Sequence, residues 1–415
     1  MQGLMRNQIG KIAALWIVLV LWMPASQSLA VRPKVFLHLI CEGGFDPSMV
    51  VDWKGASGVF AVEAGSAARV AASGFSHVSN PARSAVDAFF DQWGAKTSAL
   101  NGIGFDPATG GDFARGLSNT NLVSLKNRKP RNWLAAYAQD IGKGRPVPVL
   151  AFPGTNASGD VEDESLIGRV PAQYLSTSPA SPTLPVSVTD RIFRDLRKDF
   201  TALGVTMRSG SADQLDARVM DRQFRFQQVF AASIPGAWSG GYSAGDPLFV
   251  SQARAALRMF AQGKSLAAMI RVGGSMEFAT RANHFTGQSA LLQSLFSGLD
   301  KIVQDAYALG IQSELVVVVS GNTGLTPWLN SRSGKDPWPY GSILVWGDGI
   351  KMGKVGAFDD HGRGVKIDPR FGYTTGDLIR VTPANAWAAM LVLGGVDYRR
   401  WTSAQPISGI LEGGR

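Results

Sequence analysis

The sequence predicts an α/β fold, in which a mostly parallel β-sheet carries helices on both faces. Short apolar runs alternate along the chain with longer segments of helical periodicity, an order that places a helix between successive parallel strands. Several of these runs lack polar alternation, which is typical of strands buried on both faces. The chain is also long enough to bury one large core.

The first predicted strand, residues 34–40, is almost continuously apolar and precedes Gly43-Gly44, which indicates a tight loop. A helix follows over residues 85–93 and a strand over residues 98–103. The next predicted elements are a helix at 132–141, a strand at 147–152, helices at 189–203, 212–232 and 247–262, and a strand at 266–272. We expect residues 155–188, which are rich in Ser, Thr, Pro and Gly, to form a long surface excursion.

The clearest helix covers residues 288–309, where leucines recur at helical spacing and Gly310 is placed as a C-terminal cap. A strand of mainly β-branched residues follows at once, at 315–319. Another strand is predicted at 343–346, and a last helix at 384–393. Strands and helices therefore alternate to the end of the chain, with no internal repeat.

The first 30 residues have the features of a secretory signal peptide. Arg6 and Lys11 precede an apolar run, and Ser28-Leu29-Ala30 supplies small residues at the −3 and −1 positions of a cleavage site. The apolar run is shorter than the roughly 20 residues that span a membrane. We expect cleavage after Ala30, with retention as an anchor as the alternative. Residues 31–415 would then form a single domain, periplasmic or secreted, without a transmembrane segment.

The charge and cysteine content of the chain limit the classes of binding partner and the sources of its stability. The formal net charge is +9, but the basic residues are scattered apart from a short cluster at 126–131. No nucleic-acid-binding motif accompanies that cluster, so we expect no nucleic-acid partner. An exported protein partner or an anionic ligand remains open. Cys41 is the single cysteine, which excludes an internal disulfide, so core burial must supply the stability of the domain.

Three loops follow predicted strands, where open α/β sheets bind their ligands. In and around these loops the chain carries, in order, Gly43-Gly44-Phe45-Asp46, Asn101-Gly102-Ile103, residues 278–283, 322–327, 334–339 and 347–355, and Thr382-Pro383. The order and spacing of these segments resemble a family of exported sulfatase-like proteins of unknown function within the alkaline phosphatase superfamily. The resemblance covers residues 34 to 400 and implies an alkaline phosphatase-like fold. It also implies two divalent metals that act on phosphate or sulfate esters.

The chain departs from this family at the positions that would bind the metals. Ala279 and Arg281 stand where the family has Asp and His, and Asn322 and Pro337 replace Glu and His. Alanine and proline have no side-chain ligand, and the permanent charge of arginine repels a metal ion. We therefore expect no two-metal centre and no cofactor, although a remodelled divalent metal site stays open.

The candidate cleft consists of Asp46, Arg281, Asn283, Asn322 and Asp336. Of these, Asp46 and Asp336 are the residual metal-ligand candidates. Arg281 could bind a carboxylate, sulfate or phosphate directly. Alternatively, Arg281 pairs with Asp46 or Asp336 in place of the lost metal, and we favour this salt bridge because it compensates the leftover carboxylates.

Other reactive groups fit poorly to known chemistries. His38 lies inside the first strand, which favours a core role, whereas His284 could point into the cleft. Residues 241–245 match the Gly-X-Ser-X-Gly pattern but lack the strand that a nucleophile elbow needs, so we favour a glycine loop. The cluster Asp359-Asp360-His361 is typical of a solvated turn, and Cys41 of a small buried thiol.

The leading hypothesis is an exported sulfatase-like protein that lacks the two-metal hydrolase site and acts in binding or assembly. The alternative is a hydrolase of phosphate or sulfate esters with a remodelled site, and it predicts that Asp46, Asp336 and His284 converge. A third hypothesis assigns residues 155–188 to docking within a secreted or surface-attached assembly. Whether the protein is an enzyme is left open by the sequence.

Overall fold

The computed structural model describes residues 32–55, 59–105, 121–122, 131–153, 155, 166–170, 225–226, 228–229, 246–273, 277–376 and 378–414. Three expected features lie outside these residues: the signal peptide at 1–30, the helix at 189–203 and the glycine loop at 241–245. So do almost all of the helix expected at 212–232, most of the excursion at 155–188 and most of the basic cluster at 126–131.

An eight-stranded sheet organises the unit Lys34–Arg415. In spatial order its strands are β12 (Gly353–Val355), β4 (Thr97–Gly104), β11 (Tyr340–Gly347), β8 (Leu315–Gly321), β1 (Val35–Cys41), β7 (Ala267–Val272), β5 (Val149–Ala151) and β6 (Ile167–Arg169). Within this sheet β11 is antiparallel to both of its neighbours, and the other pairs are parallel. The carboxyl ends of the parallel strands therefore meet at one edge of the sheet.

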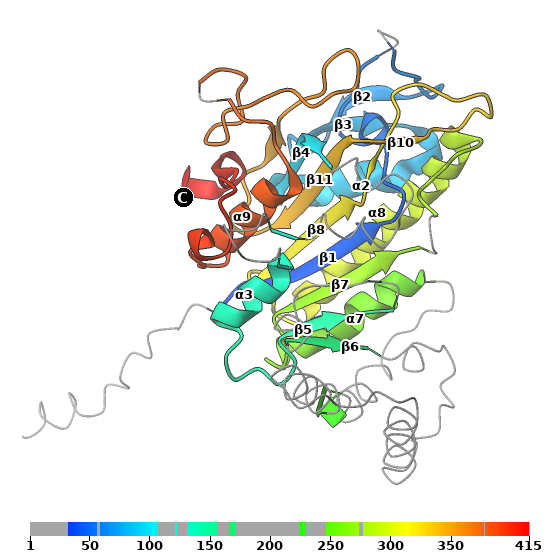
Figure 1. The fold of residues 1–415 in the computed structure, drawn as a ribbon. Helices are drawn as coiled ribbons and strands as arrows, with labels where there is room; N and C mark the ends of the chain where they lie inside the picture. The colour runs from blue at the N-terminus through cyan, green and yellow to red at the C-terminus, as the bar shows by residue number, and fades with distance from the viewer. Residues whose placement is uncertain are drawn as a thin grey trace, which may run out of the picture. The chain divides into compact units, whose positions relative to one another are not determined.

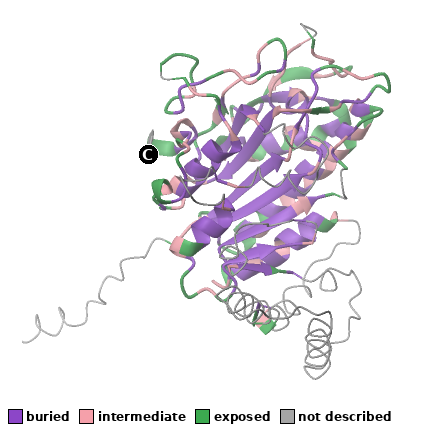
Figure 2. Cartoon of the chain, in the orientation of Figure 1, coloured by how far each residue is buried: buried purple, intermediate pink, exposed green. Residues whose placement is uncertain are grey.

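Helices cover both faces of the sheet. On one face α8 (His284–Ala308) packs between α2 (Ser84–Trp93) and α7 (Leu248–Ala261), and on the other α3 (Trp133–Ile141) lies against α9 (Pro383–Leu393) (Figure 1). The strands between them are almost entirely buried (Figure 2). The predicted fold class is therefore confirmed: the protein has an α/β fold with a mostly parallel sheet.

The central strand β1 is buried along its whole length and pairs with β7 on one side and β8 on the other. Its Phe36 ring meets Trp133 and Tyr137 of α3 edge-on, at centroid distances of 5.2 and 4.8 Å. Trp133 in turn stacks on Trp387 of α9 with an interplanar angle of 2°. Large aromatic rings thus connect both helices of this face to the strand, which explains why the apolar run at 34–40 folds as a core strand.

Most predicted elements are present, with small shifts in their ends. The largest shift is in α8, which begins at His284 rather than at residue 288, because its first turn carries too few apolar side chains to show the periodicity. Part of the excursion expected at 155–188 is instead the strand β6, whose Ile167 is buried and which pairs with β5. The short hairpin of β2 (Ala67–Val70) and β3 (Ser76–Ser79) was not predicted either.

In the part of the chain that the structure describes, no helix has both the length and the apolar character needed to cross a bilayer.

His38 is a core residue of β1, as the sequence indicated. Its ring is fully buried, and Trp133 Nε1 donates a hydrogen bond to His38 Nδ1 at 3.4 Å. The ring proton is then on Nε2, which lies 2.8 Å from Ser320 Oγ of β8. Burial without a neighbouring carboxylate lowers the pKa of His38 to about 3.

This shift makes a prediction for acid stability. The unfolded chain binds a proton at His38 below its ordinary pKa of 6.5, whereas the folded chain does so only near 3. The stabilisation is therefore complete above pH 6.5 and is lost as pH falls towards 3, by about 1.4 kcal/mol per pH unit for one proton. When urea unfolding is measured at a series of pH values, the free energy of unfolding should fall more steeply towards low pH in the wild type than in His38→Gln. Parallel pH profiles would contradict the assignment.

Candidate functional site

Three loops bring polar side chains together at the carboxyl edge of the sheet. The loop after β1 carries Asp46, which caps the short 3-10 helix Pro47–Met49. The connection between β8 and β11 carries Lys335, and the first residue of α8, which follows β7, is His284. Because β1 lies between β7 and β8, these three segments emerge side by side.

The carboxylate of Asp46 is the centre of the cluster. Its Oδ2 atom accepts hydrogen bonds from Lys335 Nζ at 2.6 Å and from His284 Nε2 at 2.9 Å. Its Oδ1 atom accepts from the backbone N–H of Ser48 at 2.9 Å and from Ser48 Oγ at 2.7 Å. The exposed fractions of Asp46, His284 and Lys335 are 2%, 0% and 1%, so the cluster is a buried ionic site.

Burial and charge act in opposite directions on Asp46. Burial alone would raise the pKa of the Asp46 carboxyl, but the Lys335 ammonium and His284 outweigh it and hold that pKa well below its usual range. Asp46 is consequently a carboxylate. A buried charge of this kind requires its partners, because removing one of them leaves the other uncompensated in a low-dielectric environment.

His284 is fixed from its second nitrogen as well. Its Nδ1 atom lies 2.6 Å from Thr280 Oγ1, and Thr280 Oγ1 is 3.4 Å from Gln288 Oε1 in the next turn of α8. The chain enters this helix through Asn283, whose φ and ψ angles of 46° and 48° are left-handed. Asparagine tolerates that conformation better than most residues. Asn283 was expected in the cleft, but its side chain is exposed and its backbone sets the direction of the helix.

The cation that pairs with Asp46 differs from the expected one. Arg281 is exposed, and within the described residues it forms no ion pair with Asp46 or Asp336. Instead, its backbone carbonyl accepts a hydrogen bond of 3.2 Å from Asn330 Nδ2. A salt bridge to Asp46 is therefore present, but Lys335 makes it instead of the expected Arg281.

Two further candidates stabilise loops. Asn322 Oδ1 accepts a hydrogen bond of 2.8 Å from the backbone N–H of Gly43, which ties the loop after β8 to the loop after β1. Asp336 Oδ1 accepts from Asn330 Nδ2 at 3.1 Å, and its backbone pairs with Thr326. The structure thus brings Asp46 and His284 together, while Asp336 is bonded within its own loop.

The residues of this edge do not fit a divalent metal. Both oxygens of Asp46 are engaged by protein donors, and the nearest of these donors is an ammonium group. In the described residues, no group of three or more His, Cys, Asp or Glu side chains is placed to hold a metal ion. Cys41 cannot substitute, because burial raises the pKa of its thiol.

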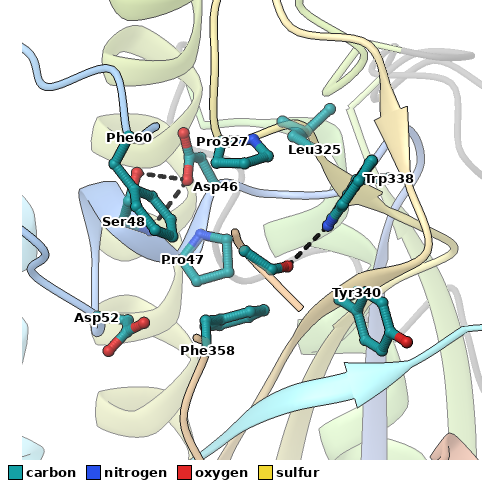
Figure 3. A pocket seen from close by; sticks show the side chains of 11 residues that line it. Asp46, Pro47, Ser48, Asp52, Phe60, Leu325, Pro327, Trp338, Tyr340 and Phe358 are labelled. Atoms are coloured by element: carbon teal, nitrogen blue, oxygen red, sulfur yellow. Dashed lines mark hydrogen bonds between the residues drawn. The ribbon is translucent and has the colours of Figure 1, made fainter. Parts of the chain in front are cut away.

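A pocket lies beside the cluster. It is a shallow hollow, whose space of about 290 Å³ includes open solvent. Its walls are Asp46, Pro47, Ser48, Asp52, Phe60, Leu325, Pro327, Trp338, Tyr340, Phe358 and Gly362 (Figure 3). The loop after β1 supplies one side of it, and the connection between β8 and β11 supplies another. The lining residues are aromatic rings and two carboxylates, and each carboxylate has a lysine partner outside the lining: Lys335 for Asp46 and Lys54 for Asp52.

Sequence reasoning pointed to loops that meet at this edge but missed Lys335, Ser48 and the aromatic walls. Lys335 adjoins the candidate Asp336, and successive side chains of an extended segment point in opposite directions. The motif alone could not decide which of the two faces Asp46. The close spacing of Trp338 and Tyr340 at the start of β11 was the available signal for an aromatic pocket.

No protein-family model matches the sequence, and no curated protein matches it significantly. Solved structures do match. The lipoteichoic acid synthase LtaP from Listeria monocytogenes is 8% identical, with 90% of this chain and 74% of that chain covered and a TM-score of 0.39. A protein in the alkaline phosphatase superfamily from Vibrio parahaemolyticus is 9% identical, with 88% and 67% covered and a TM-score of 0.40.

Alkaline phosphatase from the Antarctic bacterium TAB5 is 8% identical to this chain, with 78% of this chain and 94% of that chain covered and a TM-score of 0.35. Likeness at this level of identity and overlap carries no conclusion about activity.

The buried cluster predicts a strong and non-additive effect on stability. Lys335→Met should lower the free energy of unfolding by about 3–5 kcal/mol, because Asp46 then keeps its charge without the ammonium. Asp46→Asn should also destabilise, by stranding Lys335. The double variant should cost less than the sum of the single variants, since neither charge remains unpaired. Urea unfolding of the three variants measures this coupling.

The matched control is Arg399→Met, which removes a cation from an exposed ion pair with Asp397. Its unfolding midpoint should stay at the wild-type value. Additive losses for Asp46→Asn and Lys335→Met would show that the two charges do not interact as described.

Proposed function

We propose that this chain is an exported, sulfatase-like protein that binds a ligand at the carboxyl edge of its sheet and has no two-metal hydrolase centre. The observation that carries the proposal is the Lys335 ammonium, buried and 2.6 Å from Asp46 Oδ2. In the family that the motifs resemble, a metal cation would compensate the carboxylate at this position. Here a lysine supplies the positive charge from within the chain.

The rest of the edge supports the same proposal. An ammonium group has no vacant orbital with which to polarise a phosphoryl or sulfuryl oxygen, and it holds no activated water. The cluster therefore compensates charge and fixes loops, and the pocket beside it remains available to a ligand. Binding, rather than metal-assisted hydrolysis, is the activity that this arrangement favours.

A metal-free hydrolase is the second candidate, because Ser48, Asp46 and His284 are linked in one chain of hydrogen bonds. Their order is unfavourable for catalysis, since Asp46 lies between the serine and the histidine. The depressed pKa of Asp46 makes it a weak base for the Ser48 proton. His284 contacts Asp46 and Thr280 instead of Ser48, so the geometry does not provide an activated nucleophile.

The proposal predicts the behaviour of the purified protein towards metals. We expect metal analysis to find no stoichiometric Zn, Ca or Mn. Neither EDTA nor added metal should shift the melting temperature, and aryl phosphate and aryl sulfate should not be hydrolysed. Lys335→Met with added Mn²⁺ is the matched comparison, because it removes the competing ammonium. Stoichiometric metal in the wild type, together with hydrolysis that Asp46→Ala abolishes, would overturn the proposal.

Export is the other part of the proposal, and it rests on the signal-peptide features of residues 1–30. When the full chain is expressed in a bacterial host, we expect the protein in the periplasmic fraction or the medium. N-terminal sequencing should begin at Val31. A product that stays in the membrane fraction and begins at Met1 would instead identify the segment as a retained anchor.

A further inference from the structure

We infer that the pocket beside Asp46 is a binding site for an aliphatic ammonium group. The inference deepens the proposed function, since it names the chemistry of the ligand that this edge would take. The sequence left an anionic ligand open, whereas this inference assigns a cationic one. The difference arises because the sequence did not reveal which side chains form the walls of the pocket.

The pocket combines rings and carboxylates, which is the composition that stabilises organic cations. Phe60, Trp338, Tyr340 and Phe358 line it, together with the carboxylates of Asp46 and Asp52. Cations within about 6 Å of an aromatic centroid are attracted by the negative face of the ring. A carboxylate at the same site adds a charge-assisted hydrogen bond.

Two cationic side chains of the protein itself already lie against walls of the pocket. Lys54 Nζ lies 5.9 Å from the centroid of the Phe60 ring, donates to the Phe358 carbonyl at 2.7 Å and is 3.2 Å from Asp52 Oδ2. On another wall, the Arg380 guanidinium lies 5.9 Å from the centroid of the Tyr340 ring. Both cations approach from residues outside the lining, so ring and carboxylate groups of the pocket bind positive charge in the folded protein.

Asp52 is the recognition carboxylate. Its Oδ2 atom is buried and accepts no well-aligned hydrogen bond from the described residues, although the Lys54 ammonium is close. Burial raises the pKa of Asp52, and the nearby charge of Asp46 acts in the same direction, against Lys54 and Lys354. A bound ammonium would take the place of the Lys54 ammonium beside Oδ2, which lies 3.2 Å away, and would stabilise the charge of Asp52 in its stead.

The pocket offers an anion few free hydrogen-bond donors. The hydroxyl and backbone N–H of Ser48 are both donated to Asp46, and the Trp338 indole N–H is donated to the Gly362 carbonyl at 2.7 Å. A sulfate or phosphate placed there would face carboxylates and engaged donors, and would lose its hydration without replacement. An alkylammonium can put its head group against Asp52 and leave its chain towards solvent.

Isothermal titration calorimetry of the exported protein with butylammonium chloride tests the inference. We expect saturable binding, weakened by about tenfold or more in Asp52→Asn through loss of a charge-assisted hydrogen bond. Lys54→Met should strengthen binding, because it removes the internal competitor for Asp52. Asp397→Asn, an exposed carboxylate elsewhere, is the control and should bind like the wild type. Circular dichroism and melting temperature establish that each variant is folded.

Nα-acetyl-lysine methylamide provides an arm that distinguishes a lysine side chain of a partner protein from a free amine. Tighter binding of this compound than of butylammonium identifies the first source, and the reverse order the second. Sodium sulfate is the opposing probe. Sulfate binding without butylammonium binding, or equal affinities in the wild type and Asp52→Asn, would overturn the inference.

These outcomes are separable from the fate of the proposed function. Failure of butylammonium to bind, in a protein that holds no metal and hydrolyses neither ester, would remove only the assigned ligand class. Stoichiometric metal with Asp46-dependent hydrolysis would remove the proposed function, whichever result the titration gives.

Discussion

A buried carboxylate is the constraint on which this edge of the molecule depends. Asp46 is almost fully enclosed, so its charge must be compensated within the fold. The compensation comes from Lys335 and His284, which belong to segments far apart in the sequence. One carboxylate thereby joins the loop after β1, the start of α8 and the connection into β11. Because Lys335 and His284 both donate to the same carboxylate, the three segments hold one another in place.

The cluster and the pocket use the two carboxylates of the same loop in different ways. Asp46 is surrounded by donors on both oxygens and is kept ionised, whereas burial raises the pKa of Asp52 and leaves it short of hydrogen bonds. Similar side chains thus have opposite environments within one short stretch of chain. The first contributes to the architecture of the edge, and the second is the one to which we assign recognition, in competition with Lys54. This division is the physical basis for assigning ligand chemistry to Asp52.

Much of the fold could be predicted from the sequence, because strands that are buried on both faces are recognisable as apolar runs. Residues 34–40 and 315–319 are the best examples, and both became central strands. Short elements with few apolar side chains, such as β6 inside the expected excursion, gave no such signal. At the site, Asp46 was identifiable from its position after Gly43-Gly44. Lys335 was not, because the direction of a loop side chain depends on contacts that only the folded chain defines.

The antiparallel strand β11 has a consequence for how such a site can change over evolutionary time. Since β11 returns directly beside β8, the connection between them is confined to the carboxyl edge and supplies Lys335 and Trp338 together, just before Tyr340 begins β11. A single genetic exchange of this connection would alter the charge partner of Asp46 and the walls of the pocket at once, while the sheet stayed intact. These two properties of the site are therefore coupled, because one short segment of the chain carries both.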